Sequence, residues 1–169
     1  PFDILNKKII SLGESVHGDS LIASVEFNFI KKLTENKKCN LILWEIPYDY
    51  ILLWNLYISG DTTLTLNDVI DISKEIQINP TVLREILLYL KNYNVSEADK
   101  IYLSGIDLLS PQYIDNISVY LDLTDKQNFT EIKQNFISQL RKGNIHKAWG
   151  LLSENGIRGL ESKDTCQHF

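Results

Sequence analysis

The stretch Leu41-Ile42-Leu43-Trp44-Glu45-Ile46-Pro47 decides the fold. It starts as an apolar run of strand length, contains one carboxylate, and ends at a proline that suits the first turn of a helix. We therefore predict a strand over Asn40–Ile46 and a helix from Pro47 to about Ser59, where Gly60 stops it.

Two other runs resemble this stretch, Lys7–Leu12 before it and Lys100–Ile106 after it. Both are mostly apolar, as is typical of strands that are covered on both faces. Segments of helix length separate the three predicted strands, and such alternation produces crossovers that make the strands parallel. We predict an α/β fold, with a parallel sheet core, helices on both faces, and a helix-rich C-terminal part.

The composition indicates one ordinary globular domain over 1–169, because 44% of the 169 residues are hydrophobic and 23% are charged. The formal net charge of -5 argues against a nucleic-acid partner, which would require clustered Lys and Arg. No apolar run is long enough to span a membrane, and the first residues lack the basic-then-apolar pattern of a signal peptide, so we expect no membrane partner and a cytoplasmic location. The oligomeric state is not indicated by the sequence.

Carboxylates follow the apolar part of all three predicted strands, as Glu14, Glu45 and Asp107. Ligands of open parallel sheets bind outside the carboxyl ends of the strands, so the three acids should emerge at one edge. His17 lies in the turn after the first strand. Glu26 lies four residues after Ile22 on the next predicted helix, where its side chain borders the buried face.

This set of side chains suits two kinds of chemistry. A carboxylate that accepts one imidazole N–H fixes the tautomer, which leaves the other nitrogen of His17 to take a proton from water. The same imidazole and carboxylates could instead hold a divalent metal. In a third interpretation Glu14 and His17 only cap a turn, but the acids at the other strand ends favour a site.

The segment Leu12-Gly13-Glu14-Ser15-Val16-His17-Gly18 resembles the LGExxHG signature of the erythromycin esterase family. The strand that ends in Glu45 resembles the second acidic motif of that family, and Gly105-Ile106-Asp107-Leu108 resembles its G-[IL]-D segment. Members of the family hydrolyse macrolide lactones or have unassigned roles. The resemblance implies a hydrolase that acts on an ester or lactone, with a small-molecule substrate and no cofactor.

Carried onto this sequence, the resemblance makes His17 the general base, with Glu14 and Glu45 orienting the imidazole or the water. Asp107 would support the site from the third strand. The chain departs from the family at Glu26, where a basic residue is usual, and it has no HNxH-like segment before Phe169. We expect either an incomplete N-terminal portion of the family domain or a divergent member, which is catalytically inactive or binds a divalent metal or another ligand in the same cleft.

Overall fold

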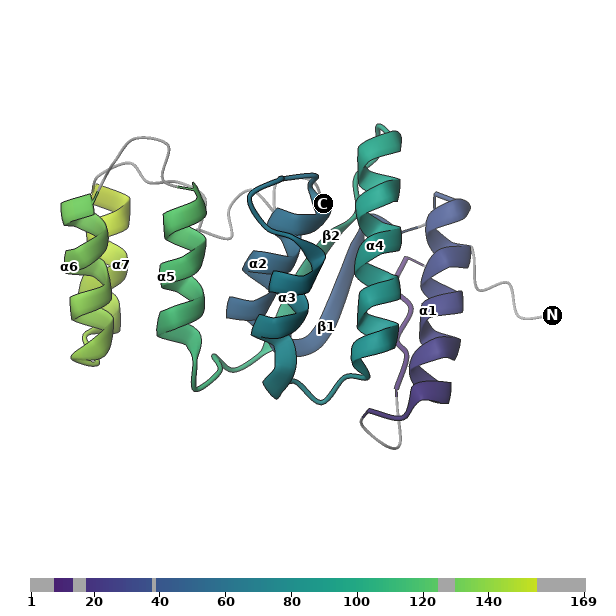
Figure 1. Ribbon diagram of the computed structural model, residues 1–169, viewed down its shortest axis with the longest axis horizontal. Coiled ribbons are helices and arrows are strands. Elements are labelled where there is room, and N and C mark those ends of the chain that lie inside the picture. Colours follow the sequence, from purple (N-terminus) through teal and green to yellow (C-terminus); the bar gives the residue numbers. More distant parts are fainter. Residues whose placement is uncertain (1–7, 14–17, 38, 125–129, 155–169) are drawn as a thin grey trace. The chain divides into compact units, whose positions relative to one another are not determined.

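The computed structural model describes residues 8–13, 18–37, 39–124 and 130–154 (Figure 1). The chain divides into two compact units, Pro1–Tyr113 and Ile114–Phe169, which we describe separately. Whether both belong to a single domain over 1–169 stays a prediction.

The first unit alternates helices and strands, as the sequence predicts. Its elements are α1 (Ser20–Glu35), β1 (Leu41–Pro47), α2 (Tyr48–Ile58), α3 (Leu66–Ile72), the 3-10 helix η2 (Ser73–Glu75), α4 (Pro80–Ser96) and β2 (Tyr102–Asp107). Local chemistry explains where the two longest helices begin. The Asp19 side chain accepts hydrogen bonds from the N–H groups of Leu21 and Ile22, and Asn79 caps α4 in the same way before a proline.

Two of the three predicted strands are confirmed, and they pair in the predicted parallel direction. β1 and β2 form a two-stranded sheet in which Leu41 is opposite Tyr102. The predicted strand over Lys7–Leu12 is wrong for its described part, because residues 8–13 have neither helix nor strand structure. Ile9 is 88% exposed and Leu12 is exposed as well, whereas Ile10 is half-buried. Apolar composition alone therefore did not produce a strand.

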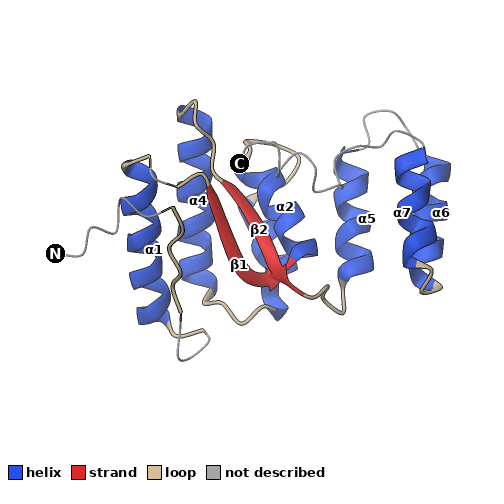
Figure 2. Ribbon diagram, turned by 180° about the vertical axis from the view of Figure 1, so that it is seen from behind, coloured by secondary structure: helices blue, strands red, loops and turns tan. Residues whose placement is uncertain are grey.

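Helix α2 covers one face of this sheet and carries much of the core. The indole ring of Trp44 packs edge-on against that of Trp54, with ring centroids 5.6 Å apart, and Trp54 donates a hydrogen bond of 2.9 Å to Ser73. Helices α3 and α4 pack against α2, and α1 packs against α4. Figure 2, from behind, shows the strands in front of α2 with no described helix across them. The described elements therefore show a two-stranded parallel sheet with helices against one face.

The second unit is helical, in agreement with the predicted helix-rich C-terminal part. It holds α6 (Thr130–Arg141), α7 (Ile145–Glu154) and most of α5 (Tyr113–Thr124). Gly143 has a φ of +74° between α6 and α7, which is the left-handed conformation common at helix ends. Lys133 of α6 forms an ion pair with Asp122 of α5. None of the described helices, in either unit, is long and apolar enough to cross a membrane.

Candidate functional site at the carboxyl edge of the sheet

The structure brings two of the predicted acids to one edge of the sheet. Glu45 lies two residues before the end of β1, and Asp107 ends β2, where it is opposite Pro47. Because the strands are parallel, both positions lie towards the same carboxyl edge of the sheet. Both are exposed to solvent. Whether the two residues form one site stays a prediction.

A bulge in β1 lies at Glu45. Trp44 pairs with Gly105 and Pro47 pairs with Asp107, so two residues of β1 are opposite the single residue Ile106 of β2. Bulges redirect side chains and are frequent beside active sites. Here Ile46 is 2% exposed whereas its neighbour Glu45 is exposed. The exposed Glu45 and the buried Ile46 thus differ as successive residues of a strand ordinarily do.

Gly105 allows β2 to approach this bulge closely. A Cβ atom at position 105 would collide with the carbonyl oxygen of Ile46 and would lie 2.9 Å from the backbone nitrogen of Tyr48. Both neighbours are backbone atoms, which cannot move aside as a flexible side chain can. The glycine in the Gly105-Ile106-Asp107 segment therefore allows close packing at the junction of β1 and α2.

Asp49 is a buried carboxylate at this edge that the sequence analysis missed. It lies in the first turn of α2 and is fully buried. Its two oxygens accept hydrogen bonds from the backbone N–H of Ser110 at 3.0 Å and from the Ser110 hydroxyl at 2.7 Å. This pair ties the loop after Asp107 to the start of α2. The available signal was an acid in the second position of an otherwise apolar helix, where the helix dipole favours a negative charge.

Two asparagine side chains form hydrogen bonds with the backbone of β2 and of the residue before it, on the side away from β1. The Asn55 amide donates to the Leu103 carbonyl at 2.8 Å and accepts from the Leu103 N–H at 3.0 Å. Asn94 makes the same double contact with the backbone of Ile101, at 2.9 and 2.8 Å. Since these backbone groups are satisfied by side chains, β2 ends the sheet on this side without an exposed row of donors and acceptors.

The other predicted site residues are on different elements or outside the described part. Glu14 and His17 lie outside the described residues. Glu26 is half-buried on α1, which packs against α4. Gly18, after the motif histidine, has a φ of +76°, a conformation that favours glycine.

The chemistry of an ionised carboxylate limits what Glu45 and Asp107 can bind. An ionised carboxylate is only an acceptor, so Glu45 and Asp107 can orient an imidazole N–H, a water molecule or a substrate hydroxyl. Carboxylate oxygens are also ligands for hard cations. No group of three or more His, Cys, Asp or Glu side chains suited to a metal ion occurs among the residues that the structure describes.

Comparisons of the chain with protein-family models, with curated proteins and with solved structures find no match.

Proposed function

We propose that the protein is a hydrolase that acts on a small-molecule ester or lactone at the carboxyl edge of its sheet. The observation that carries the proposal is the parallel pairing of β1 and β2, because parallel strands end at one edge of the sheet and Glu45 and Asp107 are near these ends. The proposal includes a cytoplasmic location and a parallel sheet with helices on both faces, which would extend the pair β1 and β2. The resemblance of the LGExxHG-like segment to the erythromycin esterase family supports it.

In the proposed reaction His17 acts as the general base. Its imidazole takes a proton from water while the water oxygen attacks the ester carbonyl carbon and forms a tetrahedral intermediate. The carbon–oxygen bond to the alkoxide then breaks, and the proton held by His17 passes to that alkoxide. Glu14 and Glu45 orient the imidazole or the water, and Asp107 supports the arrangement. The products are a carboxylic acid and an alcohol, and no cofactor takes part.

The face of the sheet beside Glu45 favours an apolar substrate body. Leu43 and Ile106 are 60% and 63% exposed, and by strand alternation they lie on the same face as Glu45. Ligand sites combine apolar walls with a few polar groups that orient the reacting atoms. An ester or lactone with a large hydrocarbon part matches this combination better than a highly charged substrate does.

The test is hydrolysis of p-nitrophenyl acetate and of a macrocyclic lactone by the full chain and by three variants. We expect His17→Ala to lower kcat/KM by about 100-fold or more, because general-base catalysis contributes on that scale. Glu45→Gln keeps the side-chain shape but removes the charge, and it should lower kcat more than it changes KM. His146→Ala is the matched control, since His146 is exposed on α7 in the second unit.

Circular dichroism of each variant separates loss of activity from loss of fold. Full activity of His17→Ala would overturn the assignment of the base. Inactivity of the unmodified chain towards both substrates would overturn the hydrolase proposal. It would favour the alternative of a catalytically inactive domain that binds a divalent metal or another ligand through the same carboxylates.

A further inference from the structure

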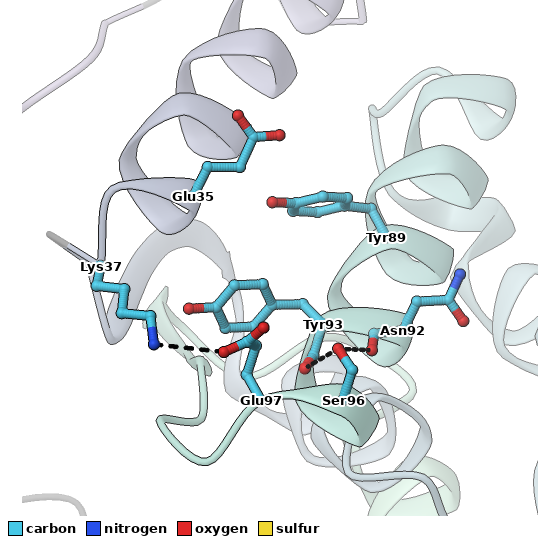
Figure 3. A pocket seen from close by; sticks show the side chains of 7 residues that line it. All are labelled: Glu35, Lys37, Tyr89, Asn92, Tyr93, Ser96 and Glu97. Carbon is cyan, nitrogen blue, oxygen red and sulfur yellow. Dashed lines mark hydrogen bonds and ion pairs between the residues drawn. The ribbon is translucent and has the colours of Figure 1, made fainter.

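A hollow of about 380 Å³ lies between the carboxyl-terminal ends of α1 and α4 (Figure 3). Most of its charged and polar groups are bound within the chain. The Lys37 ammonium pairs with Glu97 at 3.4 Å, and the Ser96 hydroxyl donates to the carbonyl of Asn92. The Lys100 ammonium donates to the carbonyl of Glu97, just after the end of α4. These contacts complete the two helix ends, so we assign the hollow to the packing of α1 on α4.

A different polar pair, Asp49 and Ser110, lies beside the carboxyl edge of the sheet. Asp49 is fully buried and Ser110 is 5% exposed. The Asp49 carboxylate accepts two hydrogen bonds from Ser110, one from its backbone N–H and one from its hydroxyl. Hydrogen bonds to a carboxylate are stronger than those between neutral groups, and burial keeps water from competing for them. The pair is therefore a firm connection between α2 and the segment that follows β2.

The loop between Asp107 and Ser110 has little apolar packing to hold it. Its two middle residues, Leu108 and Leu109, are 85% and 42% exposed. One end of the loop is fixed by the pairing of β2 with β1, and the other end is fixed by the hydrogen bonds to Asp49. Because the leucines contribute little, the position of the loop depends on these two ends.

This loop in turn orients the carboxylate of Asp107. The backbone N–H of Leu108 donates a hydrogen bond of 2.7 Å to Oδ1 of Asp107. The other oxygen, Oδ2, has no hydrogen-bond partner among the residues that the structure describes, and the side chain is exposed. Oδ2 can therefore face a water molecule or a substrate. A displacement of the loop would move the Leu108 N–H, and the preferred direction of the carboxylate would change with it.

We propose that Asp49 is a positioning residue of the candidate site. Through Ser110 it holds the loop whose first N–H, that of Leu108, orients the Asp107 carboxylate. The proposal rests on the proposed hydrolysis, in which Asp107 supports the arrangement of imidazole and water. Asp49 does not touch the substrate, because it is fully buried. Its loss would leave Asp107 correctly oriented in only a fraction of the molecules, which lowers the rate of the chemical step more than the affinity for substrate.

The test compares two buried serines in the hydrolysis of p-nitrophenyl acetate by the full chain. Ser110→Ala removes the hydroxyl and keeps the backbone N–H, and we expect kcat to fall about tenfold while KM changes less than about twofold. Ser110→Thr keeps a hydroxyl and should recover most of kcat. Ser73→Ala is the matched control and should leave kcat unchanged, because Ser73 is also 5% exposed and its hydroxyl also forms two hydrogen bonds.

A double-mutant cycle shows whether the pair acts through Asp107. Ser110→Ala should lower kcat when Asp107 is present and should have little further effect in the Asp107→Ala background, because the carboxylate that it positions is then missing. Asp49→Asn should reproduce this pattern, and Ser110→Ala decides the question if Asp49→Asn does not fold. Additive losses in the cycle, or an unchanged kcat in Ser110→Ala, would overturn the proposal.

Backbone order parameters from nuclear magnetic resonance separate this proposal from that of the hydrolase. In Ser110→Ala the order parameter of the Leu108 amide should fall from about 0.85 to about 0.6, and in Ser73→Ala it should not change. If the unmodified chain hydrolyses no ester, the proposed function fails, and the order parameter still shows whether the Asp49–Ser110 pair holds the loop that orients Asp107. An unchanged order parameter in Ser110→Ala would overturn the positioning role, whatever the activity.

Discussion

The two faces of the sheet differ in what supports them. On the face against α2, Leu103 is 1% exposed and Trp44 packs on Trp54. On the opposite face Leu43 and Ile106 are mostly exposed, although both side chains are apolar, as those on the covered face are. The covered face holds the fold through packing, whereas on the other face Glu45, Leu43 and Ile106 are exposed. Packing and solvent exposure are thus divided between the two faces of one layer of backbone.

The largest expected effect is the difference in stability between the two faces when a leucine on each is replaced by alanine. Leu103→Ala should lower the free energy of unfolding by about 3 kcal/mol, because it leaves a cavity in a close-packed layer. Leu43→Ala should change it by less than about 0.5 kcal/mol, since the side chain is already in water. Urea unfolding of both variants measures the difference. Equal losses in the two variants would contradict the asymmetry between the faces.

A smaller effect is expected at Gly105, where the sheet meets the start of α2. Gly105→Ala should lower the free energy of unfolding by about 2 kcal/mol, because the new methyl group meets backbone atoms of Ile46 and Tyr48. Gly13→Ala is the matched control, since a Cβ atom at that position has no neighbour within 4 Å. If thermal unfolding shows Gly105→Ala to be as stable as the control, the close approach at the bulge is not required.

The smallest of the three effects concerns the outer edge of β2. Asn55→Ala removes both side-chain partners of the Leu103 backbone, and we expect a loss of about 1.5 kcal/mol from the unsatisfied groups. Hydrogen exchange should be faster at the Leu103 amide in particular. Asn67→Ala removes an exposed amide that contacts Arg84, so it serves as a control with little effect. Unchanged exchange at Leu103 would show that Asn55 does not protect this edge.

Part of the fold could be predicted from local sequence because its causes are local. The apolar runs before Pro47 and Asp107 predicted β1 and β2 to within two residues, and the helices after Asp19 and Asn79 begin at side-chain caps. The parallel direction followed from the helix-length segments between the strands. The position of Glu45 and Asp107 near one edge followed in turn from that direction, because parallel strands end at the same edge.

What the sequence alone determined is therefore the order of elements, the direction of the two strands, and the position of two carboxylates at one edge. Tertiary structure decided that residues 8–13 form no strand and that β1 has a bulge between Trp44 and Pro47. It also decided that Asp49 is buried against Ser110. It also created the hollow between α1 and α4. These features depend on contacts between segments far apart in the chain, and a local pattern of apolar and charged residues does not encode which partner each segment meets.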